Sequence, residues 1–230
     1  MAVHGAIILL SLLIQPLRLL AAEPSCLRIA SIAEAPDLNF GGELGEALYR
    51  EAGLCVSVVQ IPTERMKRMI ERGELDGVVV RTREFIDAVP ELIAVPTPVL
   101  QIDGRLYWRA GQAEPKAGSR IGIPRGWIWP RHIVEAIRAE PVEVDVNESL
   151  LHMAEAGRID GFIMAETEFA SFVASGRRPG PFSSRSVGIL MLHHAVTRVH
   201  ADLVPALDAA VRRLVERGEV KQLLGLHPSP

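Results

Sequence analysis

The chain has 230 residues, of which 48% are hydrophobic and 23% charged, so it can bury a sizeable core as one large domain or two small ones. Its formal net charge of −3 gives no reason to expect a nucleic acid or an acidic membrane surface as a partner. The catalytic motifs G-x-S-x-G and H-E-x-x-H do not occur in it, and we expect neither a metal nor a cofactor.

The N-terminal segment has the pattern of a secretory signal. Residues 6–20 are apolar, but the stretch is short for a bilayer span and contains Pro16 and Arg18. It is followed by small residues and then by a polar stretch, so we expect a signal peptide over residues 1–22 that is cleaved after Ala22. The alternative is an uncleaved anchor, because the segment before the apolar stretch is poor in cations.

Export makes the two cysteines informative. Cys26 opens the first expected strand (residues 27–31), and Cys55 opens the second (residues 56–61). If these strands are parallel neighbours, both cysteines lie at the same end of the sheet. We therefore predict a Cys26–Cys55 disulfide, with two small buried side chains as the alternative.

Strand and helix patterns alternate through the first half of the chain. This alternation indicates an α/β fold with a parallel sheet and helices on both faces. The expected elements are strand 27–31, helix 42–52, strand 56–61, helix 63–72, strand 78–80, a proline-containing loop over 81–98 and strand 99–109.

After a polar break at residues 111–118, the alternation starts again and then ends in a long amphipathic helix. The expected elements are strand 120–123, helix 128–139, strand 142–146, helix 148–156, strand 160–164, helix 166–175, a loop over 176–181, strand 187–194, helix 202–217 and a short helix over 220–224.

One corner of the chain occurs twice. Residues 64–80 and 148–164 both predict a helix, a glycine stop, a turn and a buried strand, and they align without a gap. We interpret this as two similar lobes, although any helix–glycine–strand corner could look alike. The repeated aspartates are expected to be structural, because a short carboxylate in a turn can accept backbone N–H bonds. The identical pairs are Glu64/Glu148, Met69/Met153, Glu71/Glu155, Gly73/Gly157, Asp76/Asp160 and Gly77/Gly161.

The order of elements and the repeated corner resemble the type 2 periplasmic solute-binding proteins, and in particular family 3, the relatives of the polar amino-acid binders. The motifs behind the resemblance are E-R followed by GELDG in residues 64–77, GRIDG in residues 157–161, and HADLVPALDAAVRRLVERGE in residues 200–219.

The resemblance implies a two-lobed fold in which each lobe is a mainly parallel sheet flanked by helices. Lobe 1 would comprise residues 23–101 and 190–230, lobe 2 would comprise residues 102–189, and two crossover segments would join them. A small ligand would lie between the lobes, which close by hinge motion. In such sheets, ligands bind beyond the carboxyl ends of the strands, near helix N-termini.

In the first lobe these strand ends offer Glu34, Arg65, Arg81 and Arg83. Arg65 is our first candidate, because a cation in the first turn of a helix opposes the helix dipole and adds nothing to helix stability. Its planar donors suit a carboxylate or a phosphate. The alternative is a surface arginine paired with Glu64 or Glu34.

Arg81 and Arg83 are candidates through the resemblance. Amino-acid binders of the family often carry a Ser/Thr-x-Thr-x-x-Arg run at this place, and its arginine holds the ligand carboxylate. This chain has Val80-Arg81-Thr82-Arg83 instead, so the resemblance implies that role for either arginine.

In the second lobe the candidates are Arg125, Trp127 and Glu166. Many relatives have a hydroxyl-containing turn where this chain has Arg125 and two tryptophans; Trp127 or Trp129 would stack on a ligand or pack in the core. The aspartate that binds the α-amino group in the relatives would fall near Ala165, and Glu166 is next to it. An anionic or aromatic solute is therefore at least as compatible as a standard amino acid.

The sequence thus predicts a monomeric periplasmic protein that captures a small polar or anionic organic solute for an inner-membrane transporter or a sensor. One alternative is a dehydratase-type enzyme on the same fold, which would use Glu34, Glu166 and Arg65. The other is a signalling module that has lost its ligand.

Overall fold

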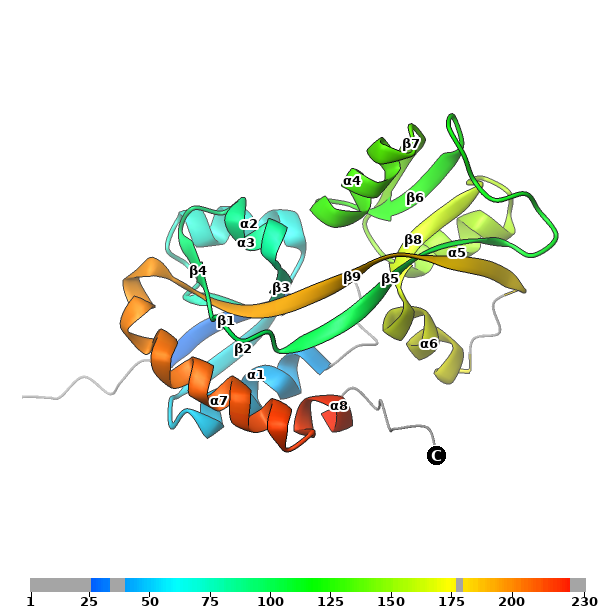
Figure 1. Cartoon of the computed structure of the whole chain (residues 1–230). Coiled ribbons are helices and arrows are strands. Elements are labelled where there is room, and N and C mark those ends of the chain that lie inside the picture. Colours follow the sequence, from blue (N-terminus) through cyan, green and yellow to red (C-terminus); the bar gives the residue numbers. More distant parts are fainter. Residues whose placement is uncertain (1–25, 34–39, 177–179, 224–230) are drawn as a thin grey trace, which may run out of the picture.

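The computed structural model describes residues 26–33, 40–176 and 180–223, so the expected signal peptide and Glu34 lie outside the described residues. The chain forms two lobes that are connected by two long strands, β5 (Leu100–Arg109) and β9 (Phe182–Thr197) (Figure 1). None of the described helices is long and apolar enough to cross a membrane.

Lobe 1 is discontinuous in sequence. It contains β1 (Leu27–Ile32), α1 (Phe40–Glu51), β2 (Val56–Ile61), α2 (Thr63–Glu71), β3 (Gly77–Thr82), α3 (Arg83–Asp87), β4 (Leu92–Ala94), the 3₁₀ helix η1 (Arg198–Leu203), α7 (Val204–Glu216) and α8 (Glu219–Leu223). Lobe 2 contains β6 (Arg120–Pro124), α4 (Ile128–Ala136), β7 (Glu140–Val144), α5 (Glu148–Glu155), β8 (Gly161–Ala165) and α6 (Glu166–Ala174).

The segment expected to be a loop over residues 81–98 contains two short elements. Thr82 Oγ1 accepts a hydrogen bond from Phe85 N at 3.4 Å and so caps the five-residue helix α3. Strand β4 then pairs antiparallel with the end of β9. Neither element is long enough to show a hydrophobic period, which is why the sequence pattern missed both.

The strands follow the order β2-β1-β3-β9-β5-β8-β6-β7. Pairing is parallel among β1, β2 and β3 and among β6, β7 and β8, and antiparallel wherever β5 or β9 takes part. The hydrogen-bonded path therefore runs unbroken from one lobe to the other. Residues 101–103 and 189–191 pair with each other between the two lobes, and the predicted boundaries after residues 101 and 189 fall in this ribbon.

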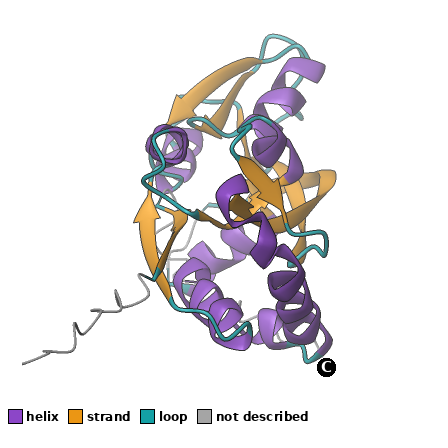
Figure 2. Cartoon of the chain, turned by 90° about the vertical axis from the view of Figure 1, so that its left-hand side faces the viewer, coloured by secondary structure: helices purple, strands orange, loops and turns teal. Residues whose placement is uncertain are grey.

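Each lobe has a hydrophobic core on both faces of its sheet. In lobe 1, one core includes Leu48 of α1 and Val211 of α7, and the other includes Met66 of α2. In lobe 2, one core includes Leu150 of α5, and the other includes Val134 of α4. The turned view shows helices packed beside the strands in both lobes (Figure 2). The layered α/β architecture follows from this burial on both faces of each sheet.

A disulfide joins Cys26 to Cys55 directly before β1 and β2. The two strands are parallel and in register from Leu27 opposite Val56, so the residues that precede them also lie side by side. The Cα atoms of the cysteines are 4.6 Å apart, which suits a disulfide.

The repeated segment forms the same corner in both lobes. Gly73 and Gly157 end their helices with φ angles of 68° and 66°, in the left-handed region that favours glycine. The residue after each glycine donates a backbone hydrogen bond of 2.8 Å to the carbonyl of Met69 or Met153. The sequence similarity between the lobes thus corresponds to shared backbone geometry.

Candidate functional site

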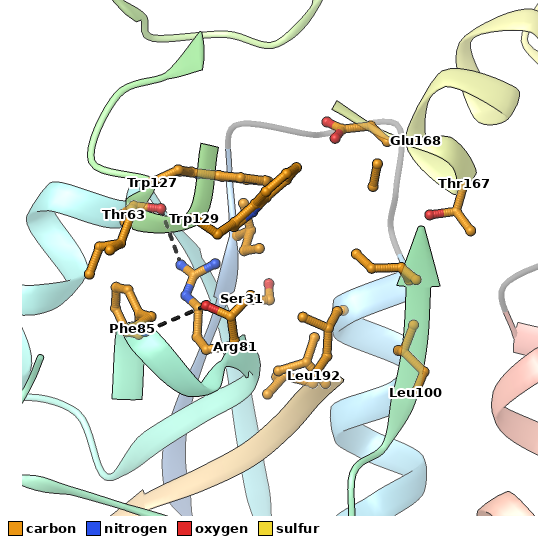
Figure 3. A pocket seen from close by; sticks show the side chains of 18 residues that line it. Ser31, Thr63, Arg81, Phe85, Leu100, Trp127, Trp129, Thr167, Glu168 and Leu192 are labelled. Atoms are coloured by element: carbon orange, nitrogen blue, oxygen red, sulfur yellow. Dashed lines mark hydrogen bonds between the residues drawn. The ribbon is translucent and has the colours of Figure 1, made fainter. Parts of the chain in front are cut away.

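A cavity of about 130 Å³ lies between the lobes. Lobe 1 contributes residues from β1, α1, α2, β3 and α3. Lobe 2 contributes Trp127, the start of α4, the end of β8 and the start of α6, and β5 and β9 complete the wall (Figure 3). Most of the lining side chains are aliphatic or aromatic. The polar lining residues are Ser31, Thr63, Arg81, Thr82, Thr167 and Glu168.

Arg81 brings a buried cation to the lobe 1 side of the cavity. Arg81 is only 6% exposed. Its Nη2 atom lies 3.3 Å from Thr63 Oγ1 and 3.0 Å from Met66 Sδ, and its guanidinium carbon lies 4.8 Å from the ring centre of Phe85. This ring contact is a cation–π interaction, so neutral groups of α2 and α3 contribute to holding the guanidinium.

A strand irregularity sets the direction of Arg81. The pairing of β3 with β9 shifts register between Val78 and Arg81. Such shifts re-aim side chains, and here Val79, Val80, Arg81 and Thr82 all line the cavity. In a regular strand, successive side chains would point to opposite faces of the sheet.

The tryptophans of lobe 2 form an aromatic wall. The rings of Trp127 and Trp129 lie 6.4 Å apart and are tilted by 49°. Trp129 packs so closely on β5 that a Cβ atom at Gly104 would lie 2.8 Å from its ring. Both tryptophans line the cavity; Trp129 belongs to a core of lobe 2, and Trp127 packs against that core.

Glu168 brings a buried carboxylate to the lobe 2 side. It is 3% exposed and accepts a hydrogen bond from Nδ2 of Asn147, which is fully buried. Glu166, the acid favoured by the sequence analysis, begins α6 and is exposed. Glu168 shares the buried face of α6 with Phe172, four residues on, and this spacing is the signal that could have identified it.

Among the described residues, Ser31 Oγ on β1 and Nε1 of Trp127 are buried at the cavity and have no hydrogen-bond partner. Buried polar groups are usually paired, so these two atoms are suited to contact a bound molecule.

By sequence, neither a protein-family model nor a curated protein matches the chain. By structure, it is similar to the GluR0 ligand-binding core in complex with L-glutamate, with a TM-score of 0.74 at 9% identity over 89% of this chain and 98% of that one. An ancestral arginine-binding protein bound to arginine gives 0.69 at 16% identity, over 87% and 96% of the two chains. The ancestral amino acid-binding protein AncCDT-1, a precursor of cyclohexadienyl dehydratase, gives 0.70 at 14% identity, over 87% and 94%.

The chain has the type II solute-binding fold. In this fold the cavity is the cleft between the lobes, and the β5–β9 ribbon is the connection that crosses it.

The two lobes approach each other at a second pocket, called here the mouth of the cleft, which shares Trp127 and Ile128 with the cavity. Gly126, in the turn before α4, has a φ of 76° and lies against the Glu64 side chain of α2. Lys67 lies 3.4 Å from Glu64, and Arg131 of lobe 2 also borders this mouth. A side chain at position 126 would overlap Glu64 Oε1 and would have to displace that side chain, so glycine suits both the backbone conformation and the approach of the lobes.

The structure separates the predicted site residues. Arg81 and Trp127 line the cavity, whereas Arg65, Arg83 and Glu166 are exposed and are not among its lining residues. Arg65 points outward because α2 buries Thr63, Met66, Met69 and Ile70 instead. We therefore transfer the main candidate role from Arg65 to Arg81.

Arg83 and Arg125 have carboxylate partners on their own lobes. Arg83 Nε lies 2.9 Å from Asp87 Oδ1, one helical turn away. Arg125 borders the mouth of the cleft, where its Nε lies 2.6 Å from Asp145 Oδ1 and its Nη1 lies 3.1 Å from Glu143 Oε2. The hydrogen bond with Asp145 raises the pKa of Arg125. Among the described residues, no cluster of three or more His, Cys, Asp or Glu residues is placed to hold a metal ion.

Proposed function

We propose that this protein is a family 3-type solute-binding protein that captures a small polar or anionic organic solute, either amino-acid-like or an organic acid, between its lobes. The observation that carries the proposal is the buried guanidinium of Arg81 at an interlobe cavity with mainly apolar walls. Release and capture of the solute would follow opening and closing of the lobes about the β5–β9 ribbon.

Arg81 favours a carboxylate as the bound group. A guanidinium offers five donors in a fixed fork, and its hydrogen bonds to a carboxylate are charge-assisted. Thr63, Met66 and Phe85 hold the group in place without adding a negative charge of their own. In surroundings of low polarity, an incoming anion is attracted more strongly than it would be in water.

The similar structures support a small organic ligand. One is an arginine-binding protein bound to arginine, and another is a ligand-binding core in complex with L-glutamate. Both ligands carry a carboxylate, which is the group that Arg81 suits.

We also propose export to the periplasm through the signal peptide over residues 1–22, and a monomer that delivers its solute to an inner-membrane transporter or a sensor. The Cys26–Cys55 disulfide supports an oxidising compartment, because disulfides persist mainly outside the cytosol. Fractionation of cells that express the full chain tests this location, and protein retained in the cytosol would contradict it.

The residues on which the dehydratase alternative depends do not all lie at the cavity. Of the three residues that it drew on, Arg65 and Glu166 are exposed and outside the cavity lining, and Glu34 lies outside the described residues. The ancestral dehydratase precursor AncCDT-1 is itself described as an amino acid-binding protein. A binder returns its ligand unchanged, so chromatography of the compound recovered after incubation separates the two functions.

Thermal-shift screening over amino acids, organic acids, aromatic acids and polyamines tests the binding function, because a ligand that binds the native state raises Tm. For the best hit, we expect Arg81→Gln to weaken binding by about tenfold or more. The matched control is Arg83→Gln, which removes an exposed arginine two residues away and should leave the affinity unchanged. Equal affinities for both variants would contradict the proposed role of Arg81.

A further inference from the structure

Two buried donor groups at the cavity, the hydroxyl of Ser31 and the indole N–H of Trp127, come from opposite lobes (Figure 3). Ser31 lies near the end of β1 and is 4% exposed, and Trp127 directly precedes α4. Neither Ser31 Oγ nor Trp127 Nε1 has a hydrogen-bond partner among the described residues. A buried polar atom without a partner is unfavourable, so both atoms favour a ligand that can hydrogen-bond to them.

The chemistry of these two groups calls for an acceptor atom on the ligand. An indole N–H can only donate a hydrogen bond, whereas a hydroxyl can donate or accept one. An oxygen atom of the ligand can accept from both groups, but an ammonium group has no acceptor to offer to Trp127. The pair therefore discriminates between a ligand with an oxygen substituent at this place and a ligand with an ammonium group.

Ser31 lies near Arg81, the residue proposed to bind a carboxylate. It belongs to β1, which pairs with β3, the strand that carries Arg81, and neighbouring strands are about 5 Å apart. The first turn of α1 packs on Ser31 at Gly41, where a Cβ atom would lie 2.8 Å from Ser31 Cβ. Glycine thus lets α1 approach without placing a side chain over Ser31. An acceptor that reaches the hydroxyl is therefore attached close to the carboxylate.

The acidic residue of the cavity has a partner within its own lobe. Glu168 is 3% exposed and accepts a hydrogen bond from Nδ2 of Asn147, which is fully buried. A hydrogen bond compensates for the burial of a carboxylate, so part of the compensation of Glu168 does not depend on a cation of the ligand. Most of the other lining is apolar, with Ile102 on β5 and Leu192 on β9, and a hydrocarbon or aromatic body would gain from burial there.

We infer that the ligand is an α-oxo or α-hydroxy acid with an apolar body. Its carboxylate binds Arg81, and the oxygen on the adjacent carbon accepts hydrogen bonds from Ser31 Oγ and Trp127 Nε1. This inference rests on the proposed binding function and selects the organic acids within it. The inferred ligand class differs from the arginine and L-glutamate bound to the similar structures.

A matched set of ligands tests the inference with the wild-type protein. The compounds α-ketoisocaproate, α-hydroxyisocaproate, leucine and isocaproate share one carbon skeleton and one carboxylate. They differ only at the carbon next to the carboxylate, which carries an oxo group, a hydroxyl, an ammonium group or hydrogen. Isothermal titration calorimetry measures each affinity. We expect the oxo or hydroxy acid to bind about tenfold or more tightly than leucine or isocaproate, because the latter two leave Trp127 Nε1 without an acceptor.

Two variants locate the oxygen contact. Trp127→Phe keeps an aromatic wall but removes the donor, so it should abolish the preference for α-ketoisocaproate over isocaproate while isocaproate still binds. Trp108→Phe makes the same change at a tryptophan of β5 that packs against the same core of lobe 2 and is not among the cavity-lining residues, so it should leave the preference intact. Ser31→Ala removes the hydroxyl of the opposite lobe and should reduce the same preference.

The outcomes separate this inference from the proposed function. If leucine or isocaproate binds as tightly as the two oxygen-bearing acids, or if only other compounds of the thermal-shift screen bind, the inference is wrong and the binding function stands. If Trp127→Phe binds isocaproate, which shows that the variant is folded, and retains the wild-type preference, the inferred oxygen contact is wrong. If no compound of the screen binds to the wild type, both the inference and the proposed function are wrong.

Discussion

Asp76 and Arg28 are joined by two reciprocal hydrogen bonds. Asp76 Oδ2 accepts from Arg28 N at 2.7 Å, and Asp76 N donates to Arg28 O at 2.9 Å. The second lobe repeats the arrangement between Asp160 and Arg120, at 2.7 Å and 2.8 Å. In each lobe the aspartate connects the turn before one strand (β3 or β8) to the start of a neighbouring strand (β1 or β6). This agrees with the structural role expected from the repeat.

Replacement of Asp76 should therefore destabilise the fold. We expect Asp76→Ala to lower the free energy of unfolding by about 1–2 kcal/mol, because Arg28 N and His200 Nε2 both lose their acceptor. Asp160→Ala should cost about 1 kcal/mol, since its side chain is more exposed. Urea denaturation measures both. Asp87→Ala, which removes an exposed surface partner of Arg83, is the control and should cost little.

Reduction of the disulfide should also lower stability. The bond spans a sequence separation of 29 residues, for which loop-closure entropy predicts a stabilisation of about 3.5 kcal/mol. The measurement compares urea denaturation with and without a reducing agent, and the Cys26→Ala/Cys55→Ala double variant should match the reduced protein. Two reactive thiols in the denatured, unreduced protein would show that the bond does not form.

His194 should make stability depend on pH. It is completely buried on β9, and its Nδ1 donates to Val79 O at 3.1 Å while its Nε2 accepts from Tyr49 Oη at 3.2 Å. Desolvation lowers the pKa of His194 to about 4, whereas an exposed histidine in the unfolded chain titrates near 6.5. The unfolded state therefore binds the additional proton between these values, so stability is complete above pH of about 6.5 and falls as the pH decreases to about 4.

The loss of stability between pH of about 6.5 and 4 should reach about 3 kcal/mol for this pKa shift of His194. Urea denaturation at several pH values measures it. His194→Gln should be less stable at neutral pH but should show a smaller decrease between pH of about 6.5 and 4. His152→Gln, which changes an exposed histidine of α5, should retain the full decrease. If wild type and His194→Gln show the same pH dependence of stability, other titratable groups cause it.

Gly126 should control closure of the lobes. Gly126→Ala places a Cβ atom against Glu64 Oε1 and forces a left-handed backbone on alanine, so we expect weaker ligand binding, by about tenfold, together with a loss of stability of about 1 kcal/mol. Gly118→Ala imposes the same backbone strain in lobe 2, but nothing lies within 4 Å of its Cβ, so it should lower stability alone.

A second change separates steric overlap from backbone strain at this position. In the Gly126→Ala/Glu64→Ala double variant, the overlap is removed, and ligand affinity should recover while stability does not. Calorimetric titration with the best ligand and small-angle scattering measure affinity and lobe separation. An affinity for Gly126→Ala equal to that of Gly118→Ala would show that the contact with Glu64 does not govern closure.

Much of the fold could be predicted from the sequence because the signals are local. The helix stops at Gly73 and Gly157, the alternation of strands and helices and the placement of both cysteines before neighbouring strands are all properties of short segments. The long strand β5 was expected within one residue of its observed start. The short elements α3 and β4 were missed because they lie in a proline-containing stretch that shows no clear helix or strand period.

The sequence by itself determined the two-lobed α/β architecture and the strand ends near which a site would lie. Only the tertiary structure decided that Arg81 and Glu168 face the cavity and that Arg65 and Glu166 do not. The physical reason is that a side chain's direction depends on non-local contacts. A register shift against β9 re-aims the end of β3, and packing of α2 and α6 against their sheets selects which residue of each first turn is buried.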